Sequence, residues 1–205
     1  MLITKVEQVN KKKSFVYVDE KRIGAFYIGE IKRLHLEKGK KLEKDEINHL
    51  NQLLYQRAKE RALFLIQKTE QTTEQIRKKL KMNYYSDEVI EQVINFLEEY
   101  RFLDDERYIK QFVSCKENKY SIRVIKEKLM QKGIDKKLID SVLKDLENKE
   151  EEVILKIIEK KQKKQMIMSY EEKNKLIQHL LYKGFNYSMI KDMIEKYQKI
   201  KEKEA

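Results

Sequence analysis

The side chains that most often perform chemistry in proteins are few in this sequence and widely spaced. The three histidines are His35, His49 and His179, and none forms a metal-ligand pair with another histidine or the cysteine. Cys115 has no partner for an internal disulfide, and its apolar periodic surroundings predict a buried side chain rather than a nucleophile. The acidic run at 104–106 is typical of the first turn of a helix, where the helix dipole favours carboxylates.

Motifs that build nucleotide-binding or catalytic sites do not occur in the sequence. It has no phosphate-binding glycine loop, no dinucleotide fingerprint and no nucleophile elbow. The 205 residues include five glycines and no proline or tryptophan, which also argues against a sandwich or barrel of many short strands. We therefore expect a protein without catalytic activity, cofactor or metal, whose function depends on its surface.

The surface must be heavily charged, because charged side chains make up 40% of the chain and the net charge is +11. Residues 1–44 carry 12 basic and 6 acidic side chains, and residues 105–205 carry 25 and 18. The middle segment, residues 45–104, carries 9 basic and 11 acidic side chains. Basic ends favour a polyanionic partner such as nucleic acid or a nucleoprotein, although a solvated lysine-rich surface explains the charge equally well.

Basic side chains in the second half of the chain are the candidate binding residues. Arg123 and Lys126 are three residues apart, so they share one side of a helix. Tyr120 and Tyr170 precede expected helices and could stack on bases, but packing in the core or at a corner is the favoured interpretation. The predicted partner-binding or DNA-binding residues are Lys119, Arg123, Lys126, Lys132, Lys160, Lys161, Lys163 and Lys164.

The N-terminal segment has a different pattern from the rest of the chain. β-Branched and aromatic runs at 15–18 and 23–28 are separated by charged residues, which predicts a β-hairpin. Residues 2–9 fit a third strand of the same sheet. A short helical turn around 30–37 is expected to stop at Gly39.

An internal repeat follows. From about residue 43 onward, apolar residues recur at three- and four-residue spacing, which predicts helices. Three segments align at offsets of 49 and 51 residues, so the repeat is about 50 residues long. Four of the aligned apolar positions are Ile76, Ile125 and Leu176; Leu80, Leu129 and Leu180; Ile90, Ile139 and Ile190; and Ile94, Leu143 and Ile194.

Each repeat is expected to be a bundle of three helices with a tight corner between the last two. Gly133 and Gly184 occupy this corner in two copies, so either Tyr84 in the first copy adopts a left-handed conformation or its corner differs from the other two. The predicted N-caps of the last helices are Ser86, Asp135 and Asn186. The expected division is a β-strand extension with a helical turn at 1–42, a linking helix with repeat 1 at 43–102, repeat 2 at 103–147 and repeat 3 at 148–205.

Four segments carry a family resemblance. These are Thr-Thr-Glu-Gln-Ile at 72–76, Phe-Leu-Asp-Asp-Glu-Arg-Tyr at 102–108, Arg-Val-Ile at 123–125 and Lys-Gly-Ile at 132–134. Through these four segments the chain resembles the RecX regulatory protein family, whose members modulate the RecA recombinase. It departs from the family at packing and cap positions, with isoleucine at 109 and serine at 121 where the family often has alanine and glycine.

The resemblance implies a mostly α-helical fold of three tandem three-helix repeats in an elongated curved array, with a small N-terminal β extension. It also implies a monomer that binds the RecA–DNA filament and inhibits ATP hydrolysis, filament growth and strand exchange. Direct binding to DNA or RNA without RecA, or a general interaction scaffold, are the alternatives. The N-terminus has no signal-peptide core and no apolar run could span a membrane, so we expect a cytoplasmic protein without a membrane partner.

Overall fold

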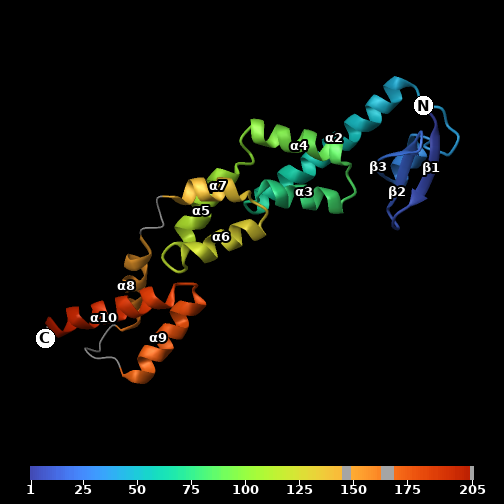
Figure 1. The fold of residues 1–205 in the computed structure, drawn as a ribbon. Helices are drawn as coiled ribbons and strands as arrows, with labels where there is room; N and C mark the ends of the chain where they lie inside the picture. The colour runs from blue at the N-terminus through green and yellow to red at the C-terminus, as the bar shows by residue number, and fades with distance from the viewer. Residues whose placement is uncertain (145–148, 163–168, 204–205) are drawn as a thin grey trace. The chain divides into compact units, whose positions relative to one another are not determined.

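The computed structural model describes residues 1–144, 149–162 and 169–203, which form a mostly helical chain with one small sheet (Figure 1). The chain divides into two compact units, Met1–Asp104 and Asp105–Ala205. The first unit holds the sheet and one three-helix repeat, and the second holds two further repeats. The predicted fold class of three three-helix repeats with an N-terminal β extension is thereby confirmed, while the elongated, curved arrangement stays a prediction.

The N-terminal sheet has three antiparallel strands in the order β1-β2-β3. The third strand that residues 2–9 suggested is therefore present. The turn between β2 and β3 places Asp19 and Glu20 at φ 45° and 64°, as a two-residue hairpin turn with both residues left-handed requires. The strands are β1 (Ile3–Gln8), β2 (Lys13–Val18) and β3 (Lys21–Tyr27).

The helical turn after the sheet, α1 (Ile28–Arg33), ends earlier than the sequence suggested. The left-handed residue that stops it is His35, with φ 50°, and not Gly39. Gly39, at φ 92°, lies in the next turn, where its amide donates to the Ile3 carbonyl oxygen 2.8 Å away. This segment therefore folds back along β1 instead of continuing as a helix.

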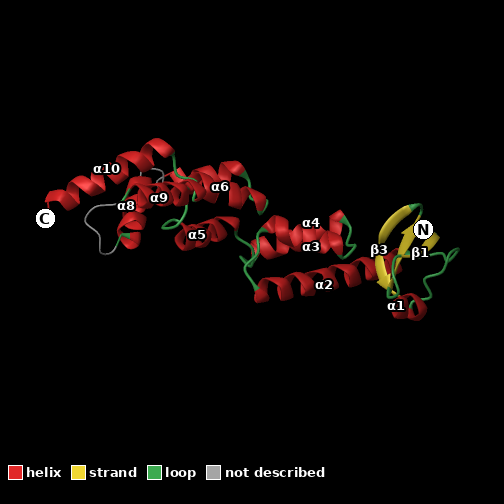
Figure 2. Ribbon diagram, turned by 90° about the horizontal axis from the view of Figure 1, so that it is seen from below, coloured by secondary structure: helices red, strands yellow, loops and turns green. Residues whose placement is uncertain are grey.

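A single long helix joins the sheet to the first repeat. This helix, α2 (Lys44–Lys68), passes the sheet and then runs beside α3 (Thr73–Met82) and α4 (Asp87–Glu99), as Figure 2 shows. A Cβ on Gly24 of β3 would lie 2.5 Å from Cδ1 of Leu54, so the strand and helix approach closely. Because of this contact the sheet and repeat 1 share one hydrophobic core.

The second unit contains two bundles with separate cores. Repeat 2 consists of α5 (Asp105–Lys116), α6 (Ile122–Gln131) and α7 (Lys136–Leu143), and repeat 3 of α8 (Glu150–Lys161), α9 (Tyr170–Tyr182) and α10 (Tyr187–Lys203). The twelve side chains at the four aligned positions named above are buried, with at most 4% of each exposed. Of the other aligned residues, Tyr85 is half-buried and Leu146 lies outside the described residues. The internal repeat found in the sequence therefore corresponds to equivalent core positions in the three bundles.

The corner between the last two helices has the same geometry in all three repeats. Tyr84, Gly133 and Gly184 have φ values of 70°, 85° and 90°, which confirms the left-handed alternative for Tyr84. In each copy the next residue donates its amide hydrogen to a carbonyl of the last helical turn, as from Tyr85 to Leu80. The side chains of the predicted caps Ser86, Asp135 and Asn186 accept backbone hydrogen bonds at the start of the next helix.

One buried position was assigned wrongly from the sequence. Cys115 is exposed, because the buried face of α5 is formed by Ile109 and Val113. Tyr108 and Phe112 also belong to the apolar side of α5 but remain half-exposed. Two apolar stripes thus lie next to each other on this helix, and the core of repeat 2 uses the one without the cysteine.

None of the helices in the described parts of the chain combines the length and the apolar character needed to cross a membrane.

Candidate interaction surface

Helix α6 presents the predicted residues Arg123 and Lys126 to the surface. The helix starts at Ser121, whose buried hydroxyl oxygen accepts a hydrogen bond from the amide of Val124 at 3.3 Å. The buried side chain of Leu129 fixes the rotation of the helix around its axis. With this face turned inward, the charged side chains must point away from the core of repeat 2.

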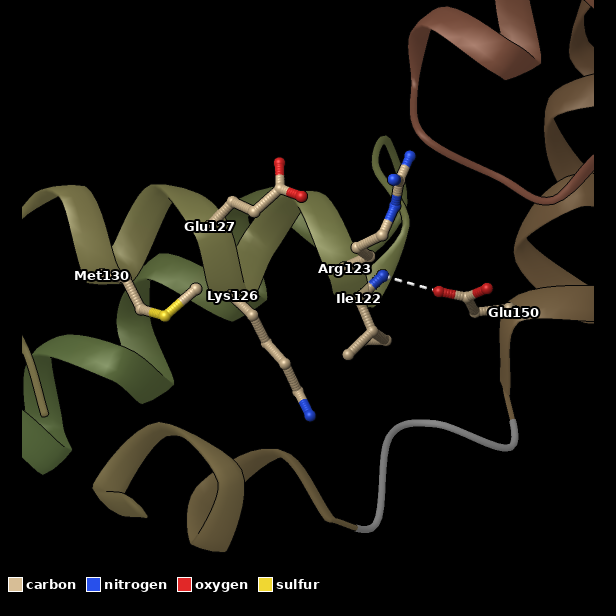
Figure 3. Close-up of a pocket in the computed structure, with 6 residues that line it drawn as sticks. All are labelled: Ile122, Arg123, Lys126, Glu127, Met130 and Glu150. Atoms are coloured by element: carbon tan, nitrogen blue, oxygen red, sulfur yellow. Dashed lines mark hydrogen bonds between the residues drawn. The ribbon is translucent and has the colours of Figure 1, made fainter. Parts of the chain in front are cut away.

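Arg123 and Lys126 line the same cavity, which has a volume of about 480 Å³ (Figure 3). Glu150 of repeat 3, at the start of α8, forms part of the cavity wall. One of its carboxylate oxygens accepts a hydrogen bond from the amide of Ile122 at 2.6 Å. This carboxylate satisfies a free amide at the start of α6 and joins the two repeats. The lining residues are Ile122, Arg123, Lys126, Glu127, Met130 and Glu150.

The two basic side chains of this cavity differ in their electrostatic state. The Lys126 ammonium lies 2.8 Å from a carboxylate oxygen of Asp140 on α7. The hydrogen bond from Lys126 lowers the pKa of Asp140, and the Lys126 and Lys136 charges act in the same direction. Arg123 is exposed and has no ion-pair partner among the described residues. The Arg123 guanidinium is therefore available to a partner, and it lies among the carboxylates of Glu127 and Glu150 rather than in an unbroken row of positive charges.

A second, more enclosed cavity of about 260 Å³ lies beside the first, and Tyr120 and Glu150 are among its lining residues. The ammonium groups of Lys128 and Lys183 each lie 4.3 Å from the centre of the Tyr120 ring, within the range of cation–π attraction. A hydrogen bond with Lys183 lowers the pKa of the Tyr120 hydroxyl, and the charges of Lys183 and Lys128 lower it further. Tyr120 therefore packs between basic side chains at the junction of repeats 2 and 3.

The structure does not bring all predicted binding residues together. Lys132 lies at the end of α6, where its ammonium stands 5.6 Å from the ring centre of Tyr108. Lys119 lies in the exposed turn before α6, and Lys160 and Lys161 lie in the last turn of α8. The predicted residues Lys163 and Lys164 lie outside the described residues. Among the predicted residues that the structure describes, only Arg123 and Lys126 line one cavity.

Sequence reasoning missed the acidic members of this surface and misjudged one tyrosine. Glu150, in the first turn of α8, looks in sequence like an ordinary helix-start carboxylate, yet it caps a helix of the neighbouring repeat. Asp140 gave no signal because its partner is on another helix. Tyr170, expected to pack in the core or at a corner, is 80% exposed. No group of three or more histidine, cysteine, aspartate or glutamate side chains in the described ranges is placed to hold a metal ion.

Comparisons with known proteins match this architecture repeat by repeat. The protein-family model of the first three-helix domain of RecX matches residues 58–97, that of the second matches 104–143 and that of the third matches 149–194. A regulatory protein RecX from Clostridium botulinum (strain Eklund 17B / Type B) is 32% identical over 205 residues, which cover 94% of each chain. The chain belongs to the RecX family.

Two further RecX proteins are similar to this chain. The regulatory protein RecX of Clostridium acetobutylicum is 37% identical over 146 residues, which cover 69% of this chain and 67% of the relative. A crystal structure of a regulatory protein RecX superposes with a TM-score of 0.55 at 25% identity, covering 93% of this chain and 98% of the other. The RecX likeness therefore includes most of the N-terminal extension as well as the three repeats.

Proposed function

We propose that this RecX-family chain binds the RecA–DNA filament and inhibits its ATP hydrolysis, its growth and its strand exchange during recombination and DNA repair. The observation that carries the proposal is the succession of three three-helix repeats, each matched by its own RecX domain model. The chain acts by contact as a cytoplasmic monomer, and RecA performs the chemistry.

The surface of α6 supports contact with a protein. Arg123 is free to bind a partner carboxylate, while Lys126 is paired with Asp140 and Glu127 lies nearby. A surface that alternates positive and negative groups selects a partner of complementary pattern and sets its register. A uniform polyanion would meet repulsion from the carboxylates of Glu127 and Glu150.

The decisive experiment is a titration of DNA-dependent ATP hydrolysis by the cognate RecA with the full-length chain. We expect the rate to fall at amounts of chain below that of RecA, because a bound regulator affects neighbouring filament subunits. Strand exchange should fall in parallel. An unchanged rate of ATP hydrolysis and strand exchange at stoichiometric amounts would contradict the proposal.

A control separates filament binding from removal of DNA. The titration is repeated with a large excess of single-stranded DNA over both proteins. Inhibition that persists excludes sequestration of DNA and supports contact with the filament. Inhibition that disappears indicates that free DNA competes with the filament for the chain, and inhibition that also requires one chain for each DNA site would favour the alternative of a direct nucleic-acid-binding protein.

A further inference from the structure

A second charged surface lies in the first unit, where the sheet meets α2, and it includes none of the binding residues predicted from the sequence. Arg57 of α2 is its fixed centre. One guanidinium nitrogen lies 2.9 Å from a carboxylate oxygen of Glu30 in α1, and another donates to the Ala25 carbonyl oxygen at 3.2 Å. The Arg57 side chain is only 17% exposed, and its Nε is buried without a hydrogen-bond partner among the described residues. The cation is therefore held firmly against the end of β3.

Further basic groups surround Arg57 without matching carboxylates. The Lys13 ammonium, at the start of β2, lies near Arg57 and Arg61, and neither Lys13 nor Arg61 forms an ion pair in the described part of the chain. Burial lowers the pKa of Lys13, and the positive charges of Arg57 and Arg61 lower it further, while the Glu30 carboxylate acts in the opposite direction. Lys11 and Lys12 add two exposed cations in the preceding turn. Because Glu30 is already engaged by Arg57, the cluster has excess positive charge that a bound anion would neutralise.

The same charge continues along one stripe of α2. Arg57, Arg61, Phe64 and Lys68 are spaced four, three and four residues apart, which places them on one side of the helix. The stripe is about 17 Å long at the rise of an α-helix. Three of the four residues of the stripe are basic, and Glu60 is the one acidic residue between positions 57 and 68. The stripe is therefore a basic track, interrupted by Phe64, that leads away from the sheet.

Exposed aromatic rings alternate with these cations. Phe64 is 44% exposed, and the Lys68 ammonium lies 4.4 Å from its ring centre. Tyr27, at the end of β3, is 42% exposed, with the Lys13 ammonium 4.9 Å and the Arg57 guanidinium 5.1 Å from its ring centre. Exposed rings beside a basic track are the combination by which proteins bind single strands, since bases stack on the rings and cations meet the phosphates. An acidic peptide would use the cations but would have no comparable use for the rings.

We propose that Lys13, Arg61 and Lys68 bind the phosphates of a single-stranded nucleic acid, whose bases stack on Tyr27 and Phe64. The inference deepens the proposed function, on which it rests for its biological setting, by naming a nucleic-acid contact in the N-terminal extension and α2. The surface lies wholly within Met1–Asp104, so it depends on no arrangement between the two units.

The test measures binding of the full-length chain to a fluorescent 20-nucleotide oligo(dT) by anisotropy across a series of salt concentrations. The variant Arg61→Gln/Lys68→Gln removes two exposed cations without touching the core. Each lost phosphate contact should weaken binding about fivefold at ~0.1 M salt and reduce the log–log salt slope by about 0.7. The double variant, which loses two contacts, should therefore bind roughly 25-fold more weakly. The matched control Lys38→Gln/Lys44→Gln removes the same charge from exposed positions outside the track and should change the affinity much less.

A third variant distinguishes nucleic acid from an acidic protein partner. Phe64→Leu should weaken oligo(dT) binding at least about fivefold with an unchanged salt slope, because stacking is lost and the charges remain. Equal affinities and slopes for the parent and the Arg61→Gln/Lys68→Gln variant would overturn the proposal, as would failure of the parent to bind. If Phe64→Leu bound oligo(dT) as the parent does, and polyglutamate displaced the labelled oligo(dT) as effectively as unlabelled oligo(dT) does, the track would be assigned to acidic proteins instead. These measurements use no RecA. Binding to oligo(dT) can therefore be absent while inhibition of RecA is observed, and inhibition of RecA can be absent while oligo(dT) is bound.

Discussion

The backbone amide of Ser121 donates a hydrogen bond to the carbonyl oxygen of Lys183, and the two atoms are 3.0 Å apart. This bond joins the start of α6 in repeat 2 to the corner after α9 in repeat 3. The next residue, Gly184, has φ +90°, and a Cβ at this position would lie 2.6 Å from the Ser121 hydroxyl and overlap the Val124 side chain. Gly184 thus serves both the turn of its own repeat and the contact with its neighbour.

We expect Gly184→Ala to lower the free energy of unfolding of the second unit by about 2–5 kcal/mol. The left-handed conformation costs a non-glycine residue roughly 1–2 kcal/mol, and overpacking against Ser121 and Val124 adds about 1–3 kcal/mol. Urea unfolding of the full-length chain measures the change. The control is Gly39→Ala, which has a left-handed φ of +92° but open space around it, so only the conformational cost applies. An equal loss of unfolding free energy in both variants would show that Gly184 is not closely packed against Ser121 and Val124.

Leu129→Ala should destabilise repeat 2 by about 2–5 kcal/mol, because its side chain is fully buried in the core of that repeat. Met130, the next residue, is 41% exposed and lines the cavity, so Met130→Ala should have a much smaller effect. Thermal unfolding followed by circular dichroism compares the two variants. If both melted as the parent does, Leu129 would not belong to the core.

Charge reversal at Arg123 and Lys126 should weaken binding to the RecA–DNA filament roughly tenfold or more at low salt, since like charges across an interface repel. The Lys126→Glu change also places a carboxylate beside Asp140, so a small loss of stability should accompany it. Lys191→Glu/Lys196→Glu makes the same charge change at exposed positions of α10 and serves as the control. Retained inhibition of RecA by the Arg123/Lys126 variant would remove these residues from the binding surface.

The stability of repeat 3 should depend on pH through His179. Burial lowers the pKa of His179, and the positive charges of Lys161 and Lys183 lower it further. Between the folded pKa and the ordinary value of 6.5, the unfolded chain binds more protons than the folded one. The free energy of unfolding should therefore be higher above pH 6.5 and fall as the pH decreases through this window.

The variant His179→Gln isolates this contribution from that of the carboxylates. Urea unfolding of the parent and the variant at several pH values between 8 and 5 gives the difference in slope. We expect the variant to lose less stability than the parent below pH 6.5. Parallel curves would mean that His179 has the same pKa in the folded and unfolded chains.

Much of the fold could be predicted because its signals are local. The N-caps Ser86 and Asp135, and the left-handed corner at Tyr84, depend on hydrogen bonds within a few residues of the chain. The apolar positions of each repeat follow the helical period for the same reason. Cys115 marks where this reasoning fails, since α5 has two adjacent apolar stripes and its packing against α7 decides which one is buried.

The candidate surface could be predicted only in part. Arg123 and Lys126 are three residues apart on one helix, so their common side follows from the helical period. Their acidic neighbours come from other helices: Asp140 from α7 and Glu150 from α8. A charged residue in sequence does not reveal its partner, and so the mixed character of this surface was not predictable.

The sequence by itself determined the strands, the helices of the threefold repeat and the caps of their last helices, since each depends on residues close together in the chain. Only the tertiary structure decided that Glu150 caps α6, that Gly184 packs on Ser121, and that Arg57 is held by Glu30 beside the sheet. These contacts join residues 27 to 63 positions apart. Their existence depends on the angles and distances at which finished elements pack, which no local pattern specifies.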